Sequence, residues 1–238
     1  MKTSASPAAD TPNLAPQLAA NDAPDTLCFG KAAGRPRAAD KEARQQALLH
    51  TAASLFLEKG YGKVSLEMIA REAHVAVRTI YVKFGGKAGL LSAVITNGRA
   101  RFFEGMQDMQ TDVRPLQEIL GDFSLRFVEL VTLPTFASLC RMVVAEAKTT
   151  PELAESFYHA GPQQTREQLA LFFARPEIRA QLRDDVPLEA LPVHLLNCIM
   201  GDQLLPMLFA KDVPPSTAEN CARVELGLNL FFASVLRK

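Results

Sequence analysis

Two short helical segments joined by a three-residue connection constrain the fold of this chain more than any other feature. Ser65 has the side chain of a good N-cap, so a short helix is expected to follow it. Apolar residues recur on one face of that helix, at Leu66, Ile69, Ala70 and Ala73. After the connection 74–76, a second helix turns Ile80 and Phe84 inward and is interrupted at Gly85-Gly86. This spacing predicts a helix-turn-helix, with the small side chain of Ala70 where the two helices touch.

The rest of the sequence also has helical rather than strand periodicity. One helix is expected from Asp40 to Lys59, just before Gly60, and another from Lys87 to about Met109. Further helices, punctuated by proline, are expected at 115–132, 134–148, 151–174 with a break at Gly161-Pro162, 176–184, 188–210 and 215–237. Because no period-2 alternation of useful length occurs, the predicted fold is all-α.

Composition and charge divide this predicted fold into a tail and two domains. Residues 1–33 are rich in Ala, Pro, Asp, Ser and Thr and are expected to be a disordered tail. We expect an N-terminal three-helix domain at 34–86 and a larger C-terminal helical domain at 87–238. The formal net charge of the chain is zero, yet residues 31–99 carry twelve Lys or Arg against five Asp or Glu. A basic module joined to an acidic one is typical of a polyanion-binding protein with a second function, although a solvated charged face looks similar.

The exposed side chains of the motif's second helix are suited to contacts with double-stranded DNA. Arg78 has the reach to donate two hydrogen bonds to a guanine, and Thr79 or Val77 can contact a thymine methyl group. The side chains expected at phosphate oxygens are Ser65, Tyr81, Lys83 and Lys87, the last together with its backbone N–H at a helix start. Upstream, Arg35 and Arg37 form a short basic arm suited to a minor groove or a phosphate track.

Residues 43–95 resemble the N-terminal DNA-binding region of the TetR family of transcriptional regulators. The resemblance rests on matching residues at Phe56, Gly60, Tyr61, Ser65, Ile69, Ala70, Val75, Thr79, Tyr81, Phe84, Lys87, Leu90 and Leu91. It implies an all-helical homodimer whose first three helices bind DNA and whose C-terminal domain binds a small molecule and dimerises. It also implies DNA-contacting roles for Ser65, Thr79, Tyr81, Lys83 and Lys87.

Three residues depart from the pattern of that family. His74 stands where the family mostly has Gly, and the left-handed conformation of such a turn costs about 1–2 kcal/mol for a residue with a Cβ. Ala76 replaces the usual Ser cap of the recognition helix, a loss of about 1 kcal/mol. Gly89 follows Lys87-Ala88, where an acidic residue and then a small one are commoner, and this predicts a loosely formed start of the next helix. The departures affect the expected affinity for DNA, not the class of protein.

The C-terminal half resembles, more loosely, the ligand-binding halves of AefR-type and AcrR-type members of the same family. Eleven of the fourteen Phe lie after residue 100. We expect some of these rings, with polar groups that fix orientation, to line a cavity for an apolar or amphipathic small-molecule effector, although each ring alone would equally suit a core. The candidate ligand-binding residues are Phe103, Phe123, Phe127, Phe136, Phe157, Tyr158, Phe173, His194 and Asn197.

The last two predicted helices, 188–210 and 215–237, are apolar over more than one face. A helix that is apolar most of the way round must be buried on both sides, and pairing with the same helices of a second copy achieves this. We therefore expect a homodimer through these helices. Its two recognition helices would lie in successive major grooves about 34–36 Å apart, which predicts a pseudo-palindromic operator. We expect the protein to be a repressor that its effector releases from this operator.

No pattern in the sequence indicates an enzyme, a cofactor or a metal site. There is no G-x-S-x-G motif, and Gly85-Gly86-Lys87 lacks the spacing of a phosphate-binding P-loop. His194 and Cys198 lie one turn apart without a third ligand nearby, and the cysteines are expected to be free thiols. Neither a signal peptide nor an apolar stretch of 18 residues is present, so a cytoplasmic protein without a membrane partner is expected.

Two other functions stay open at this point. A small-molecule binding or sequestering protein with a vestigial helix-turn-helix would bind an apolar ligand and retard no genomic DNA fragment. A thiol redox sensor that uses Cys140 or Cys198 would release DNA in response to oxidants, and exchange of the cysteine for serine would abolish that response.

Overall fold

The computed structural model describes residues 38–209 and 214–237, all within the unit Ala38–Lys238. The expected tail 1–33 and the two arginines of the basic arm, Arg35 and Arg37, lie outside the described residues. Within the described part every regular element is a helix, and the β-bridge between Leu182 and Leu236 is isolated. The predicted all-α fold is confirmed.

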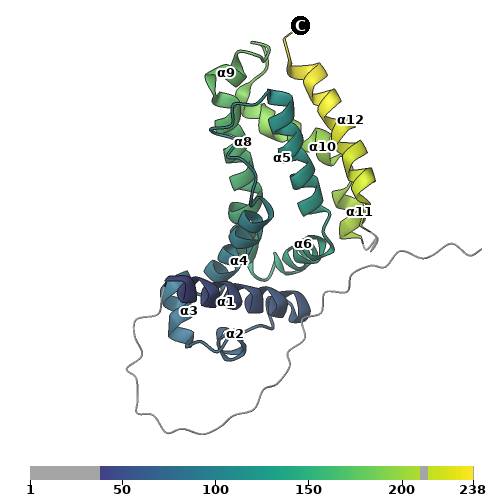
Figure 1. Ribbon diagram of the computed structural model, residues 1–238. Coiled ribbons are helices and arrows are strands. Elements are labelled where there is room, and N and C mark those ends of the chain that lie inside the picture. Colours follow the sequence, from purple (N-terminus) through teal and green to yellow (C-terminus); the bar gives the residue numbers. More distant parts are fainter. Residues whose placement is uncertain (1–37, 210–213, 238) are drawn as a thin grey trace, which may run out of the picture. The chain divides into compact units, whose positions relative to one another are not determined.

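The first three helices contain the predicted helix-turn-helix, which is formed by the second and third of them (Figure 1). α1 spans Ala38–Lys59, α2 spans Leu66–Glu72 and α3 spans Val77–Phe84. The Ser65 hydroxyl caps α2, because its Oγ accepts a hydrogen bond of 3.2 Å from the backbone N–H of Met68. α3 ends where Gly85 takes a left-handed conformation with a φ of 74°, which a residue without a Cβ adopts at little cost.

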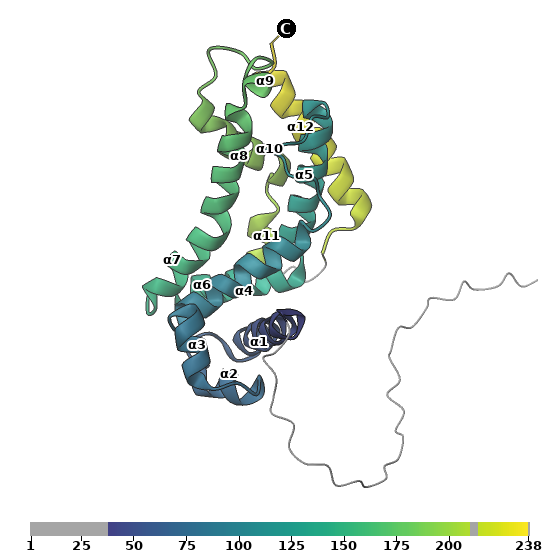
Figure 2. The same cartoon turned by 60° about the vertical axis from the view of Figure 1, so that its left-hand side comes forward.

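Helix α4, Lys87–Phe102, continues from the helix-turn-helix to the C-terminal helices (Figure 2). Its residues Leu90 and Leu91 are buried in the same apolar core as α1–α3. Two buried residues from later in the chain, Val143 and Leu153, belong to this core as well. Farther along, α4 contacts α7, Pro151–Tyr158, and the π-helix His159–Gln163. The prediction that this helix reaches Met109 is wrong, since the chain turns at Gly105, whose φ is 78°.

The start of α4 packs tightly against the end of α3. A Cβ at Gly89 would lie 1.7 Å from the carbonyl oxygen of Phe84, so a side chain at this position would push the two helices apart. The next residue, Leu90, donates a regular helical hydrogen bond of 3.0 Å to the Gly86 carbonyl oxygen. Gly89 therefore allows a close helix contact, and the loose helix start predicted from it is not observed.

The C-terminal helices enclose a second apolar core. Their bounds are Leu116–Val131 for α5, Pro134–Glu146 for α6, Gln164–Ala174 for α8, Pro176–Arg179 for α9, Leu191–Met200 for α10, Leu204–Leu208 for α11 and Thr217–Val235 for α12, with a 3₁₀ turn at Leu188–Ala190. Phe172, Phe173 and Phe231 are fully buried in this core. α12 packs against both α5 and α10, beside which it lies in both views (Figures 1 and 2).

Three further predicted helices differ from those observed. The segment 188–210 is interrupted at Gly201, whose backbone angles of 54° and −130° lie outside the helical region and suit only glycine. The segment 151–174 has no break at Gly161-Pro162, because the chain passes Pro162 in a wider π-helical turn. The segment 176–184 is α-helical over α9 only.

Helix α12 begins with a capping box and crosses α10 closely. The Ser216 hydroxyl oxygen accepts a hydrogen bond of 3.3 Å from the Glu219 backbone N–H, and the Glu219 carboxylate accepts one of 2.7 Å from the Ser216 backbone N–H. A Cβ at Gly227 would lie 2.4 Å from the carbonyl oxygen of Cys198 on α10. The crossing therefore requires glycine there and fixes which face of α12 stays outside.

Candidate functional site

The exposed side of α3 is the first candidate site. Ile80 is fully buried in the core of α1–α4, and Val77 is half-buried beside it. The side chains exposed on this helix are Arg78, Thr79, Tyr81, Val82 and Lys83. Val82, which is 76% exposed, was not among the residues expected to contact DNA, although its place off the apolar face is visible in the sequence. We call these five exposed side chains the exposed row of α3. Its guanidinium, hydroxyl, phenol and ammonium are the groups needed to read base edges and to contact phosphates.

The turn between α2 and α3 has the conformation predicted for it. His74 alone among the described non-glycine residues has a positive φ, 52°. The chain is held there by the Val75 backbone N–H, which donates a hydrogen bond of 2.9 Å to the Ala70 carbonyl oxygen. Ala76 provides no side-chain cap for α3, again as predicted. The first backbone N–H groups of α3 therefore have no side-chain acceptor and are placed at the end of a helix that favours an anion.

The residues expected at phosphates have different surroundings. Tyr81 is 55% exposed, and Lys83 donates a hydrogen bond of 3.2 Å from its Nζ to the side-chain oxygen of Gln45 on α1. Ser65 is exposed and already accepts the capping hydrogen bond of α2. Tyr81 and Lys83 thus extend the exposed row of α3, and Ser65 lies at the start of α2.

The Lys87 side chain is directed inward rather than toward the expected phosphate. Its ammonium donates hydrogen bonds of 2.8 Å to the Tyr61 carbonyl oxygen and 2.9 Å to that of Val64, and it lies 4.2 Å above the centre of the Tyr61 ring. Burial lowers the pKa of this ammonium, and the nearby Glu146 carboxylate partly offsets that effect. Lys87 therefore ties α4 to the connection between α1 and α2, and its contact with a phosphate stays a prediction.

Three of the predicted ligand-binding rings come together. Phe103, at the end of α4, stacks on Phe123 with ring centres 5.9 Å apart, and Phe123 stacks on Phe127 at 5.7 Å. Phe103 and Phe123 line a cavity of about 300 Å³. The same cavity is also lined by Thr96, Arg99, Ala100, Met106, Gln107, Asp108, Met109, Thr165 and Gln168. This cavity is mainly apolar and is the second candidate site.

The other predicted ligand residues are not brought to that cavity. Phe136 and Phe157 form a separate pair 6.3 Å apart, and Phe173 is fully buried among core rings. Tyr158 is half-exposed and its hydroxyl accepts a hydrogen bond of 2.8 Å from Arg166. His194 and Asn197 are exposed on α10, where the His194 ring contacts the Ser234 hydroxyl at 2.8 Å. Helical spacing could not separate these residues from the ring cluster, because the distinction depends on which helices pack together.

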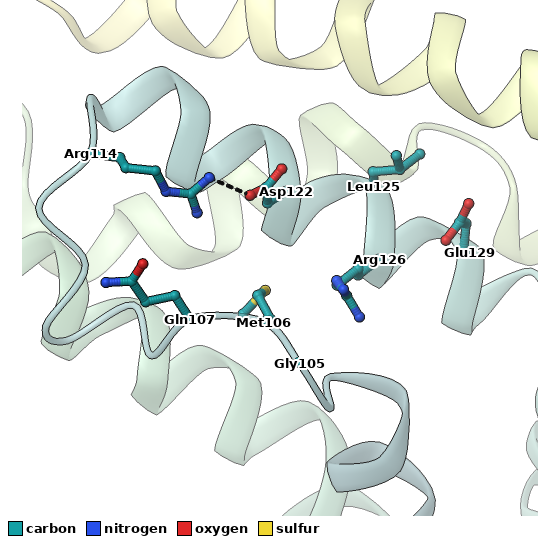
Figure 3. A pocket seen from close by; sticks show the side chains of 8 residues that line it. All are labelled: Gly105, Met106, Gln107, Arg114, Asp122, Leu125, Arg126 and Glu129. Carbon is teal, nitrogen blue, oxygen red and sulfur yellow. Dashed lines mark ion pairs between the residues drawn. The ribbon is translucent and has the colours of Figure 1, made fainter.

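A second, more polar cavity of about 800 Å³ adjoins the first and shares Met106 and Gln107 with it. Figure 3 shows the loop with these two residues facing Arg114 and, on α5, Asp122, Leu125, Arg126 and Glu129. Arg114 forms ion pairs of 2.8 Å with Asp122 and 2.7 Å with Asp112. The cationic charge of Arg114 is therefore compensated within the protein.

Other chemistry is sparse in the part of the chain that the structure describes. No group of three or more His, Cys, Asp or Glu side chains there is placed to hold a metal ion. Cys140 is buried, and burial raises the pKa of its thiol to about 11, so the reactive thiolate is disfavoured. No single described helix is long and apolar enough to cross a membrane, while α5 and α6 would pass that test as a pair but are bent by 63°.

Two family models match the chain. Residues 48–94 match the model described as bacterial regulatory proteins, TetR family. Residues 118–234 match the model of the C-terminal domain of AefR-like transcriptional repressors. The first match contains the helix-turn-helix, and the second contains most of α5 and of α12.

The chain is also similar to individual regulators. The chain is 24% identical over 184 residues to the HTH-type transcriptional repressor ComR of Escherichia coli K12. This alignment covers 74% of this chain and 82% of ComR. A putative TetR-family regulator from Mesorhizobium loti has a TM-score of 0.68 at 19% identity, over 85% of this chain and all of that one. The flavonoid-responsive regulator FrrA has a TM-score of 0.64 at 23% identity, over 83% of this chain and 99% of its own. These structures share the fold of this chain.

Proposed function

The chain belongs to the TetR family of transcriptional regulators, and from this premise we propose that it is a homodimeric repressor whose DNA binding a small molecule controls. The observation that carries the proposal is the exposed row of α3. Ile80 anchors that helix in the core, while Arg78 and Thr79 at its first turn are exposed and free to enter a major groove. Arg78 is proposed to read a guanine, and Tyr81 and Lys83 to bind phosphates beside it.

Dimerisation through α10 and α12 is supported by the apolar side chains that these helices leave uncovered. Leu226 and Leu230 lie one turn apart on α12 and are 63% and 58% exposed, and Val193 of α10 is also exposed. The same face of a second copy would cover these side chains in a twofold arrangement. Two recognition helices related by that axis would bind a pseudo-palindromic operator.

The proposal divides the functions between two domains that share packing. We propose residues 34–86 as the DNA-binding domain and residues 87–238 as the effector-binding and dimerisation domain. The core of α1–α3 includes Val143 of α6 and Leu153 of α7 as well as α4, so the two domains would be in direct contact. The effector is proposed to occupy the cavity beside Phe103 and Phe123 and to favour a conformation in which the recognition helices no longer fit successive grooves. To release most of the bound DNA, it must bind that conformation about 10⁴-fold more tightly.

A sequestering protein with a vestigial helix-turn-helix is less well supported, because α3 keeps its basic and hydroxyl side chains exposed. As a regulator of transcription the protein would act in the cytoplasm. The test is to select bound fragments from a random DNA library with the full chain and then to titrate the selected fragment in a mobility-shift assay. We expect two inverted half-sites about one helical turn apart. Failure to prefer any sequence at low ionic strength, with apolar ligand binding intact, would establish the sequestering alternative instead.

A further inference from the structure

The cavity beside Phe103 carries a cation that forms no ion pair with any of the described residues. Arg99, on α4, lines this cavity and is half-buried. A guanidinium nitrogen of Arg99 donates a hydrogen bond of 2.9 Å to the side-chain oxygen of Gln164, which is a neutral group. Within residues 38–209 and 214–237, no carboxylate lies within ion-pair distance of it. Burial without an acidic partner lowers the pKa of Arg99, so the charged form lacks some of its usual stabilisation.

The other charged residue of this cavity, Asp108, forms no ion pair with Arg99. Asp108 also lines the cavity, but one of its carboxylate oxygens already accepts a hydrogen bond of 3.0 Å from the Gln110 backbone N–H. The pKa of Arg99 is lowered by burial and not by Asp108. In the adjoining cavity, by contrast, the Arg114 guanidinium is paired with two carboxylates (Figure 3). Arg99 is therefore the cationic group that a ligand in the inner cavity can neutralise.

The rest of the inner cavity is suited to a ring. The faces of Phe103 and Phe123 are stacked, and Ala100 and Met109 add apolar surface. A volume of about 300 Å³ is at the small end of ligand cavities, which corresponds to a molecule of one or two rings. A carboxylate is planar like the guanidinium and can accept two parallel hydrogen bonds from it.

We propose that the effector is a small aromatic acid, whose carboxylate pairs with Arg99 and whose ring packs against Phe103 and Phe123. This inference rests on the proposed function, because it specifies the ligand of the proposed effector cavity. The same guanidinium holds Gln164, the first residue of α8 after the π-helix, so a bound carboxylate would act on the contact between α4 and α8. Since α4 begins against α3 at Gly89 and Phe84, a change in the contacts of Arg99 acts on the helix that supports the recognition helix.

The test compares acids with neutral molecules of nearly the same shape. Benzoate, 2-naphthoate and biphenyl-4-carboxylate are titrated into the full chain by calorimetry, each beside its carboxamide. At least one acid should bind about tenfold or more tightly than its amide, since the amide cannot form the ion pair. If no acid of the set binds more tightly than its amide, the proposal is wrong, and this comparison requires no variant that has to fold.

Two matched variants then locate the site. Arg99→Gln should remove the preference for the acid, whereas Arg101→Gln, which removes the same charge from an exposed position of α4, should keep it. An unchanged preference in Arg99→Gln would overturn the assignment to this residue. Operator binding by the same samples, measured in a mobility shift, separates the two proposals: intact operator binding without an acid preference refutes the aromatic acid alone, and loss of all sequence preference in the wild type refutes the repressor.

Discussion

The ammonium of Lys87 lies 4.2 Å from the centre of the Tyr61 ring and donates a hydrogen bond of 2.8 Å to the carbonyl oxygen of the same residue. The first residue of α4 is thereby fixed to the connection between α1 and α2. Tyr61 is itself buried, and burial, with smaller effects of Glu152 and Glu146, raises the pKa of its phenol to about 12. A movement of α4 therefore acts on residues that support the helix-turn-helix.

The raised pKa of Tyr61 predicts a loss of stability in alkali. Because the folded-state pKa lies above the ordinary 10, the stabilisation is fully present below pH 10 and is lost as the pH rises through about 12. Tyr61→Phe has no phenol to ionise. Urea titrations at about pH 9 and about pH 11 should therefore show a smaller fall in the free energy of unfolding for the variant than for the wild type. An equal fall in both proteins would contradict the role given to Tyr61.

The left-handed conformation of His74 predicts that glycine would stabilise the turn. His74→Gly removes a strain of about 1–2 kcal/mol but makes the unfolded chain more flexible, so a net gain of up to about 1 kcal/mol is expected. Ala73→Gly is the matched control, because Ala73 has an ordinary φ of −85° and should lose stability. Thermal unfolding of the two variants should shift in opposite directions, and a lower midpoint for His74→Gly would refute the strain.

The contact between Gly89 and Phe84 predicts opposite effects for two glycines of α4. Gly89→Ala places a Cβ against the Phe84 carbonyl oxygen and should cost about 2 kcal/mol or more in the free energy of unfolding, with weaker DNA binding. Gly98→Ala meets no atom within 4 Å and should stabilise the helix by about 0.5–1 kcal/mol. Denaturant titrations measure both changes. Similar stability of the two variants would show that the close approach of α3 and α4 is not needed.

The uncovered leucines of α12 predict the dimer interface. The double variant Leu226→Glu, Leu230→Glu places charges on the proposed twofold surface and should raise the dissociation constant of the dimer about tenfold or more. Leu171→Glu, at a similarly exposed leucine of α8, should leave the dimer intact. Sedimentation over a range of concentrations distinguishes the two. A double variant that stays as dimeric as the wild type would move the interface elsewhere.

The helix-turn-helix could be predicted from the sequence because its boundaries depend on neighbouring residues. Ser65 caps α2, His74 makes the turn and Gly85 ends α3, and each of these acts within a few residues of its own position. The break at Gly201 within the predicted helix 188–210 could not be predicted in this way. The apolar pattern continues across Gly201, and the sequence does not show the backbone angles that interrupt the helix there.

The sites could be predicted only in part because they depend on contacts between distant segments. The inward direction of Lys87 requires carbonyl groups more than twenty residues away, which no local pattern shows. The separation of Phe103 and Phe123 from Phe136 and Phe157 likewise depends on which helices meet. Arg99 was missed altogether, because an arginine in an amphipathic helix normally points to solvent and only the packing of α4 reveals its burial.

DNA binding by the exposed row of α3 is tested most directly by the salt dependence of two variants on the selected operator and on random DNA. Arg78→Ala should lose affinity for the operator more than for random DNA, by about 10–100-fold, because it removes a base contact. Lys83→Gln should weaken both complexes equally and reduce the slope of log affinity against log salt by about one, because it removes a phosphate contact. Arg101→Gln should change neither. Equal losses on operator and random DNA for Arg78→Ala would contradict the reading of bases by α3.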